Sequence, residues 1–361
     1  MKFIDMFSGI GGFRSALENN GHECIAYSEI DKHSIKSYNA LYDTQDEIEL
    51  GDITEISQEY LSHLKEENDI VVGGSPCQSF SKDGKRKGFE DVRGTLFFEF
   101  AKVVKETQPK YFLFENVYGL MNHDKGNTIR VILNTFNELG YYVDFNVFNS
   151  KYYDVPQNRE RIYIVGKRKD LVSSPNYHVL SKGKRKIHEL HNWCLDNVDY
   201  IHLLPTPKSR INTKLLNILE SDVSDKYLLP ENIHEKLILH HNKEENLLHV
   251  KQATKQGYDF ATKGDSVNIS FPNSKTRRGR VGKQVTQTLQ AGAVNQGVVM
   301  NDMTVRKLTP LECWRLQGFT DEQFYKAKDS GVSDNQLYKQ AGNSVTVNVV
   351  DAIVKHLFKN D

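Results

Sequence analysis

The sequence predicts an α/β protein with a doubly wound, mostly parallel sheet and a second, smaller, irregular domain. Three observations support this class. Up to about residue 167, short apolar runs alternate with helical patterns, as strand–helix–strand units require. Residues 170 to about 304 are polar with no steady period, and that stretch is too long for a loop inside a compact domain. Regular patterning then returns over residues 306–358.

Six runs in the first part of the chain are predicted as strands, because each is short and mostly apolar. They are Lys2–Phe7, Glu23–Glu29, Asp69–Gly74, Tyr111–Val117, Tyr141–Phe148 and Arg161–Gly166. Helical patterns between them include Phe13–Asn20, Leu96–Lys105 and Thr128–Leu139. A last apolar segment, Val345–Phe358, is predicted as a helix. Residues 343–345 are expected to open it, and one interpretation of Asn343 is a plain N-cap.

Composition and cysteine spacing favour an ordinary globular protein of the cytoplasm. The chain has 361 residues, of which 38% are hydrophobic and 26% charged. No apolar run approaches the roughly 20 residues of a membrane span, and residues 1–6 lack the form of a signal peptide. We therefore expect no membrane contact. The four cysteines lie far apart without a C-x-x-C pair, so we also expect no disulfide framework and no metal site.

Net charge gives no indication of a partner, because 47 basic residues balance 47 acidic ones. The distribution is more informative. Basic clusters occur at Lys82–Lys87, Lys182–Lys186 and Lys275–Lys283, each beside glycine or serine. Such runs are usually solvated surface, but three of them on loops can also form a phosphate-binding cleft.

Cys77 lies three residues after the end of the predicted strand Asp69–Gly74. Ligands of open α/β sheets bind at the carboxyl ends of the strands, where a nucleophile would be useful. A structural cysteine is the competing interpretation, since most free cysteines are small buried hydrophobes.

A glycine-rich turn between the first strand and helix predicts a cofactor site. It comprises Phe7, Ser8, Gly9, Ile10, Gly11 and Gly12. Glycines there let the backbone approach a ligand at a helix N-terminus. Glu29 and Asp52 follow the next segments, where acids can bind ribose hydroxyls and an adenine amino group. Because the turn lacks a phosphate-binding Lys or Arg, S-adenosylmethionine fits better than a dinucleotide.

A second acid, Glu115, ends the strand Tyr111–Val117 on the edge where Cys77 lies. It can grip a heterocycle held over the cysteine, or it is simply a paired buried carboxyl. Arg159 and Arg161 start the next strand on the same edge. These arginines can hold the group formed by Cys77, Glu115 and the substrate, or they can hold the cofactor. Alternatively, they form ion pairs at the start of the strand.

Six blocks in this order resemble the DNA (cytosine-5)-methyltransferase family of bacterial modification enzymes. The blocks are Phe7–Phe13, Gly74–Ser81, Phe114–Val117, Gln157–Arg161, Leu308–Phe319 and Gln340–Val345. The match covers residues 1 to about 168 and 305–361. It implies a Rossmann-like catalytic domain of residues 1–178 and 338–361, and a target recognition domain of residues 179–337 that includes a scaffold motif at 305–319.

The resemblance implies that Cys77 adds to C6 of a cytosine flipped out of DNA while Glu115 stabilises charge at N3 and the exocyclic amine, with Arg159 and Arg161 beside them. C5 then takes the methyl group of S-adenosylmethionine, a base removes the C5 proton, and elimination frees Cys77. The implied cofactor residues are Phe7, Gly9, Ile10, Gly11, Gly12, Glu29, Ile30, Asp52, Ile53, Pro76, Leu96, Asn343 and Val345. Ile30 departs from the family pattern, which often has an aromatic residue there.

The implied partner is double-stranded DNA, and a restriction endonuclease can act alongside a monomeric enzyme of this kind. Expected DNA contacts are Gln78, Ser81, Lys82, Lys85, Arg86, Lys87, Arg93, Arg277, Arg278 and Arg280. The segment Ser81–Arg93 is expected to close over the flipped base. Three alternatives remain: an RNA cytosine-5 methyltransferase, a non-catalytic DNA-binding regulator, and, least supported, a nicotinamide dehydrogenase.

Overall fold

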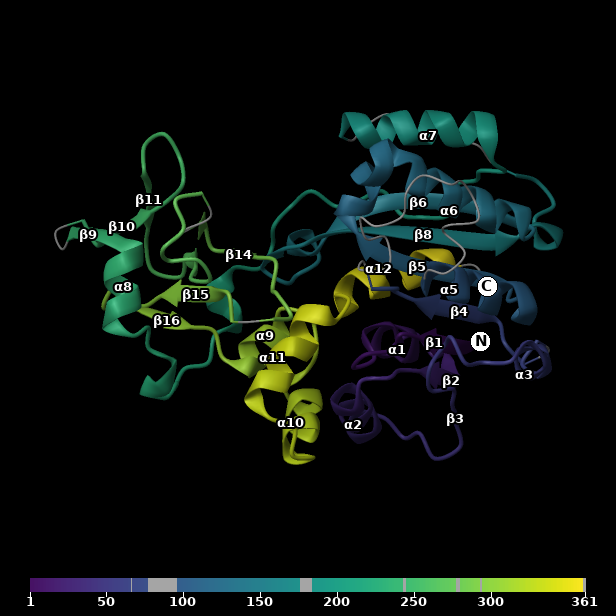
Figure 1. Ribbon diagram of the computed structural model, residues 1–361, viewed down its shortest axis with the longest axis horizontal. Helices are drawn as coiled ribbons and strands as arrows, with labels where there is room; N and C mark the ends of the chain where they lie inside the picture. Colours follow the sequence, from purple (N-terminus) through teal and green to yellow (C-terminus); the bar gives the residue numbers. More distant parts are fainter. Residues whose placement is uncertain are drawn as a thin grey trace. The chain divides into compact units, whose positions relative to one another are not determined.

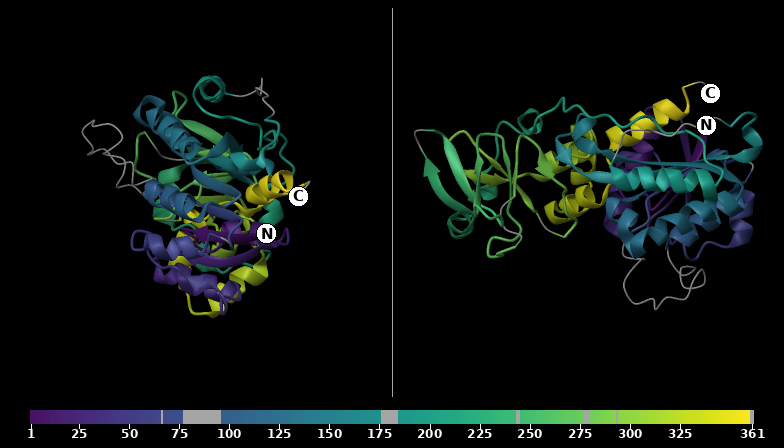
Figure 2. Two further views of the ribbon diagram at one scale, coloured as in Figure 1. Left: turned by 90° about the vertical axis from the view of Figure 1, so that its right-hand side faces the viewer. Right: turned by 90° about the horizontal axis from the view of Figure 1, so that it is seen from above.

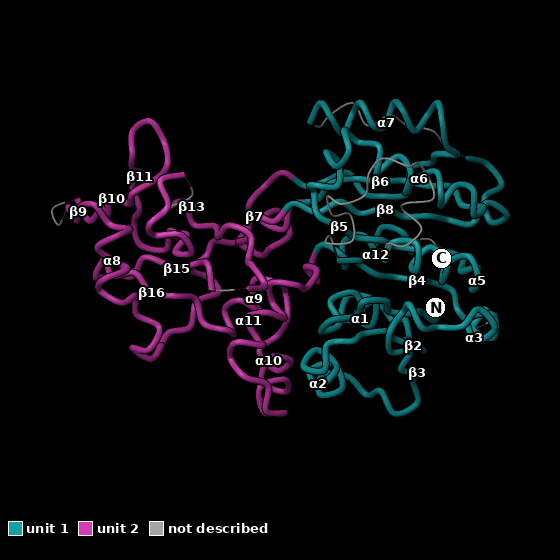
Figure 3. The backbone as a smooth tube through the Cα atoms, viewed as in Figure 1, with its two compact units in different colours: residues 1–148, 160–208, 349–361 teal, residues 149–159, 209–348 magenta. Residues whose placement is uncertain are grey.

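The computed structural model divides the chain into two compact units, coloured separately in Figure 3. Unit 1 comprises residues 1–148, 160–208 and 349–361, and unit 2 comprises residues 149–159 and 209–348. The structure describes residues 1–65, 67–76, 96–175, 184–242, 245–276, 280–292 and 294–359. Unit 1 confirms the predicted α/β class.

Unit 1 is built on a seven-stranded sheet with the strand order β3-β2-β1-β4-β5-β8-β6 (Figure 1). The strands are β1 (Lys2–Met6), β2 (Glu23–Ser28), β3 (Ile48–Glu49), β4 (Ile70–Gly73), β5 (Tyr111–Val117), β6 (Tyr141–Asn149) and β8 (Glu160–Arg168). β1 pairs in parallel with both β2 and β4, and β8 runs antiparallel to β5. From β1 the chain continues to β2 and β3 on one side of the sheet and later returns to β4 and β5 on the other side. The strand order therefore reverses between β1 and β4.

Helices cover both faces of this sheet (Figure 2). They are α1 (Gly12–Glu18), α2 (Lys32–Leu41), α3 (Gln58–His63), α5 (Leu96–Thr107), α6 (Asn127–Glu138), α7 (Arg185–Asn197) and α12 (Val347–Leu357). Ile4, Val71, Phe112 and Phe114 join α3, α5, α6 and α7 in one apolar cluster on one face. Their neighbours, such as Val72, alternate to the other face and are also buried. Burial on both faces explains why the strands are continuous apolar runs.

Unit 2 contains small sheets and short helices. Its strands are β7 (Gln157–Asn158), β9 (Ile238–Asn242), β10 (Leu247–Lys251), β11 (Tyr258–Ala261), β12 (Ser266–Asn268), β13 (Val281–Gly282), β14 (Thr286–Gln287), β15 (Gln296–Val299) and β16 (Val305–Lys307). They form sheets of order β11-β10-β9 and β13-β12-β15-β16, and a parallel pair of β7 with β14. Its helices are α8 (Glu231–Leu237), α9 (Pro310–Arg315), α10 (Asp321–Asp329) and α11 (Asp334–Asn343).

A capping box sets the start of helix α9 at Thr309-Pro310. The Thr309 hydroxyl oxygen accepts a hydrogen bond from the Glu312 backbone amide, and the Glu312 carboxylate accepts one from the Thr309 backbone amide. The Glu312 carboxylate also binds Arg306 at 2.6 and 2.8 Å, and both side chains are buried. Trp314, fully buried, donates to the Leu337 carbonyl at 3.0 Å and so joins α9 to α11.

The bounds of the two units differ from those of the predicted domains, residues 1–178 with 338–361 and residues 179–337. Helix α7 belongs to unit 1 because Ile187, Leu190 and Cys194 pack into its core cluster. Residues 149–159 belong to unit 2, where β7 pairs with β14.

The predicted start of the last helix is wrong. Helix α12 begins at Val347, and Asn343 is the last residue of α11 rather than the N-cap of α12. The Ser344 amide still donates to Gln340, which extends α11, and Ser344 then turns to extended backbone. In the described part of the chain, no helix is both long enough and apolar enough to cross a membrane.

A buried carboxyl on β1 makes stability depend on pH. Asp5 is fully buried, and its Oδ2 accepts a 3.4 Å hydrogen bond from the Tyr38 hydroxyl. Its Oδ1 has no hydrogen-bond partner among the described residues. Burial raises the pKa of Asp5 from 3.8 to about 8, although the Arg14 guanidinium opposes this rise.

We predict that Asp5→Asn flattens the pH dependence of unfolding. Between about pH 4 and pH 8 the folded protein holds a proton that the unfolded chain releases, so the wild-type free energy of unfolding falls as pH rises. The variant lacks this proton, and its advantage should widen by up to about 1.4 kcal/mol per pH unit. Urea unfolding followed by circular dichroism from pH 5 to 8 measures this, with exposed Asp46→Asn as the control. Parallel pH profiles for Asp5→Asn and wild type would contradict it.

Candidate active site

The glycine-rich turn after β1 contains three left-handed residues, Phe7 (φ 54°), Gly9 (φ 56°) and Gly11 (φ 77°). The Gly11 amide donates to Ser8 O at 2.8 Å, and the Ser8 amide donates to Ser28 O on β2 at 3.0 Å. Helix α1 starts immediately after the turn, at Gly12. The turn thus brings backbone N–H groups and a helix N-terminus to the carboxyl end of β1, the arrangement that the glycines predicted.

Glu29 lies beside this turn, at the end of β2. Its Oε2 accepts the Gly9 amide at 2.8 Å, and its Oε1 accepts the amides of Ile30 and Asp31, each at 2.8 Å. A carboxylate has about four acceptor positions, so these three bonds orient Glu29 and leave one position on Oε2. That position can accept a ligand hydroxyl.

The carboxyl end of β3 adds further groups to this edge of the sheet. Asp52 follows β3, and its Oδ1 accepts both the amide and the hydroxyl of Thr54, at 2.9 and 2.8 Å. Ile53 is buried, whereas Ile30 is 72% exposed, which is unusual for a large apolar side chain. β1, β2 and β3 are neighbours in the sheet, so their carboxyl ends share one edge.

These groups fit S-adenosylmethionine in chemistry. The Ser8 hydroxyl is buried within the turn and has no hydrogen-bond partner in the described part of the chain. A Cβ on Gly9 would meet no atom closer than 4.0 Å, so the backbone there is open to a ligand. Glu29 and Asp52 offer acceptors for hydroxyl and amino groups, and Ile30 offers an exposed apolar surface. None of these groups supplies a cation for a phosphate.

On the other side of β1, Glu115 forms the second part of the site. It lies near the end of β5, is 8% exposed and makes an ion pair with Arg161 of β8, Oε1 to Nε, at 3.0 Å. Because β8 is antiparallel to β5, Arg161 pairs in register with Val117 and reaches back to Glu115. Of the two arginines expected at this edge, Arg161 thus contacts Glu115.

Two contacts join Glu115 and its neighbour to the segment that leads to Cys77. A Cβ on Gly74 would lie 2.8 Å from Glu115 Oε2, so a residue with a side chain there would force the carboxylate to shift. The Asn116 side chain donates from Nδ2 to the Ser75 carbonyl at 3.1 Å. The roles of Asn116 and Gly74 were not predicted from the sequence, although the position of Asn116 beside Glu115 is a usable signal. Together they fix the chain up to Pro76, whose side chain is exposed.

Several predicted site residues lie outside the described residues. They are Cys77, Gln78, Ser81, Lys82, Lys85, Arg86, Lys87, Arg93, Arg277 and Arg278. Leu96, the first residue of α5, is partly buried. Arg280 is exposed and precedes β13 in unit 2. Lys184, from the second basic cluster, binds the Glu160 carboxylate at 2.5 and 2.7 Å.

The two arginines that the sequence grouped together lie in different units. Arg159, in unit 2, is buried and donates to the carbonyls of Gly342 and Ser344, at 3.3 and 2.7 Å. It thus holds the backbone on both sides of Asn343, which is exposed. Arg161, in unit 1, contacts Glu115. Val345, the other predicted cofactor residue of this segment, is nearly buried in unit 2.

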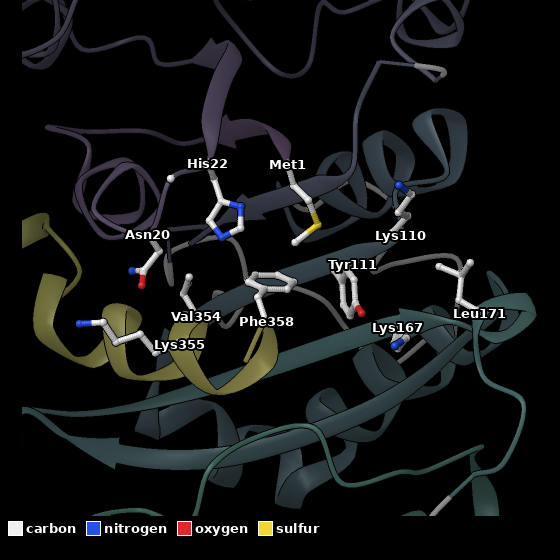
Figure 4. A pocket seen from close by; sticks show the side chains of 11 residues that line it. Met1, Asn20, His22, Lys110, Tyr111, Lys167, Leu171, Val354, Lys355 and Phe358 are labelled. Carbon is white, nitrogen blue, oxygen red and sulfur yellow. The ribbon is translucent and has the colours of Figure 1, made fainter. Parts of the chain in front are cut away.

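A separate cavity of about 710 Å³ lies at the amino ends of the strands, opposite the edge described above. The rings of His22, Phe358 and Tyr111 lie next to one another in it (Figure 4). Lys110 and Lys355 line it too, but each already binds a carboxylate at 2.8 Å. None of the predicted site residues lines this cavity. Among the described residues, no cluster of His, Cys, Asp and Glu could hold a metal ion.

Comparisons with known proteins agree with this geometry. The family model "C-5 cytosine-specific DNA methylase" matches residues 1–359. The chain is 35% identical to the orphan methyltransferase M.SPRI of Bacillus phage SPR, with 99% of this chain and 97% of the relative covered. It is 37% identical to the type II methyltransferase M.HpaII of Haemophilus parainfluenzae, with 99% and 89% covered.

Among solved structures, the Dnmt2 methyltransferase of S. pombe has the same fold. The TM-score is 0.63 at 17% identity, with 99% of this chain and 98% of that chain covered. The match of the family model over nearly the whole length is the stronger finding, and it agrees with the glycine turn and the Glu115–Arg161 pair found at one edge of the sheet. The chain therefore belongs to the C-5 cytosine-specific DNA methylase family.

Proposed function

We propose that this enzyme transfers a methyl group from S-adenosylmethionine to C5 of a cytosine flipped out of a specific short duplex sequence, through a covalent bond between Cys77 and C6. One observation carries the proposal most directly. The Glu115–Arg161 pair lies against Gly74, three residues before Cys77, on the same sheet edge as the glycine turn.

The cofactor is proposed to lie at the carboxyl ends of β1, β2 and β3. Glu29 would accept a ribose hydroxyl, Asp52 the adenine amino group, and Ile30 would cover the base. The bound cofactor supplies an electrophilic methyl group. Pro76 and Leu96, proposed as further cofactor contacts, lie before and after Cys77 in the sequence. The methyl donor and the cytosine are proposed to meet between β1 and β4, where the strand order reverses.

The chemistry on the protein side begins at Cys77. Its thiolate forms a bond to C6 of cytosine, and the electron pair of the C5–C6 double bond moves toward C5 and N3. Glu115 is proposed to accept a hydrogen bond from the exocyclic amine and, in its protonated form, to donate one to N3 as negative charge develops there, with Arg161 beside it. After C5 has gained the methyl group, a base removes the C5 proton, the C6–S bond breaks, and the double bond re-forms.

A cytosine stacked inside a duplex is not accessible to a nucleophile on the protein, so the base is proposed to leave the stack. The basic segment Ser81–Arg93 is proposed to close over it. Unit 2 is proposed to read the target sequence, with Arg277, Arg278 and Arg280 among its DNA contacts. Arg280 is exposed, as a DNA contact requires.

Membership of the DNA methylase family disfavours the RNA methyltransferase, the regulator and the dehydrogenase. We further propose that the enzyme protects host DNA in a restriction–modification system. Among the relatives, the type II methyltransferase of Haemophilus parainfluenzae, 37% identical, supports this role, whereas the relative from Bacillus phage SPR is an orphan methyltransferase. Resistance of DNA from expressing cells to an endonuclease cutting at the methylated sequence would support this role.

Cys77→Ser should abolish methylation, because a hydroxyl is a far weaker nucleophile than a thiolate at neutral pH. Bisulfite sequencing of plasmid DNA from expressing cells first identifies the methylated sequence in wild type. A duplex with 5-fluorocytosine at that position should then trap a covalent adduct, because fluorine cannot leave as a proton does. Mass spectrometry should find the adduct on Cys77. Methylation by the variant, or an adduct elsewhere, would refute the assigned nucleophile.

Gly74→Ala should lower the methylation rate at least tenfold, since its Cβ would lie 2.8 Å from Glu115 Oε2 and displace the carboxylate from Arg161. Initial rates of radiolabelled methyl transfer to DNA measure this. The control is Gly119→Ala, whose Cβ would lie 3.8 Å from its nearest neighbour. A Gly74→Ala enzyme within twofold of the control would show that the position of Glu115 is unimportant.

Arg280→Ala should weaken DNA binding several-fold and reduce the slope of log affinity against log salt by about one, as expected for the loss of one phosphate contact. Fluorescence anisotropy at several salt concentrations measures both quantities. Lys65→Ala removes an exposed charge of unit 1 outside the three basic clusters and serves as the control. Unchanged affinity and slope would remove Arg280 from the proposed DNA surface.

A further inference from the structure

The glycine turn needs support from outside, because its backbone is strained. Phe7 has a left-handed conformation, which is unfavourable for a residue with a side chain. Such conformations persist only where surrounding contacts impose them. Glu29 and Ser28 hold the side of the turn that faces β2. The carbonyls of Ile10 and Gly11, on the other side, require a different partner.

That partner is Tyr42, the C-cap of α2. Its hydroxyl lies 2.8 Å from Gly11 O and 3.3 Å from Ile10 O, and 2.6 Å from the Ser15 hydroxyl. Its ring also fills the space of the missing side chain, since a Cβ on Gly11 would lie 2.4 Å from Tyr42 Cε2. Tyr42 is 9% exposed, so it contacts the turn from the interior of the protein.

Tyr42 is itself held by a buried charge network. The Arg14 guanidinium lies 4.3 Å from the centroid of the Tyr42 ring. Both terminal nitrogens of Arg14 bind the Glu47 carboxylate, at 2.6 and 2.7 Å, and its Nε binds Glu18 at 2.7 Å. Arg14 is 2% exposed, and a two-pronged bond of this kind fixes the plane of the guanidinium. Tyr42 therefore has one available position.

We propose that Tyr42, held by Arg14 and Glu47, is a positioning residue that keeps the glycine turn in the form that binds the methyl donor. It acts through the carbonyls of Ile10 and Gly11 and does not touch the cofactor. This inference rests on the proposed cofactor site. It predicts that affinity for the cofactor depends on one hydroxyl group on the far side of the turn.

Tyr42→Phe tests this, because it keeps the ring beside Gly11 and Arg14 and removes only the hydroxyl. Calorimetric titration with S-adenosylhomocysteine should show a dissociation constant about five- to tenfold higher, the loss expected for one buried hydrogen bond. The KM for S-adenosylmethionine should rise similarly, while kcat and the KM for DNA stay within twofold. Glu47→Gln, which loosens Arg14, should shift affinity in the same direction by less.

Tyr141→Phe is the matched control. Tyr141 is also buried, and its hydroxyl also donates to a backbone carbonyl, that of Pro109 at 2.7 Å, at the amino end of β5. Thermal unfolding without ligand should shift comparably in both variants, but only Tyr42→Phe should lose cofactor affinity. Equal affinity of Tyr42→Phe and wild type, or equal losses in both variants, would overturn the proposal. Absence of binding by the wild type would instead refute the proposed cofactor site.

Discussion

The parallel pairing of β1 with β2 on one side and β4 on the other is the constraint on which unit 1 depends. Because those strands run in one direction, their carboxyl ends share one edge, and the connecting helices must cross the faces. The chain leaves β1 toward β2 and later returns to β4, so the strand order reverses beside β1. Loops on either side of that point diverge, and a ligand has space between them. The glycine turn and the segment before Cys77 occupy these two positions.

The Glu115–Arg161 pair is poorly explained by stability alone. Removing two charges from water is costly, and well-packed apolar residues often serve a core equally well. Here the acid also fits against Gly74, which has no side chain, and the neighbouring Asn116 holds Ser75. Acid, arginine, glycine and amide thus converge on a few residues of backbone. A group that must be held in one orientation needs this kind of support from its neighbours.

The elements predictable from the sequence were those buried on both faces. β5 has the predicted bounds, Tyr111–Val117, because a strand covered on both sides is a continuous apolar run. Helix α7 has a readable pattern, since its buried residues Ile187, Leu190, His191 and Cys194 follow helical spacing, but a histidine and a cysteine weaken that pattern. The strands of unit 2 have two to five residues, too few for any period to appear. The Glu115–Arg161 contact was predictable from strand ends, whereas the contact of Tyr42 with the turn was not, because α2 itself was not predicted.

The return of the chain to unit 1 explains why Arg159 and Arg161 have separate tasks. Unit 1 is complete only when α12 packs on it, and Asn20 near the end of α1 binds Asp351 of α12 at 2.9 Å across 331 positions of sequence. Contacts so distant in sequence form late, because closing so large a loop costs entropy. Arg159 holds the backbone at Gly342 and Ser344, immediately before α12, within unit 2. It therefore defines where α11 ends and α12 can begin. The same short motif thus supplies Arg161 to the acid of the candidate site and Arg159 to the segment from which unit 1 is completed.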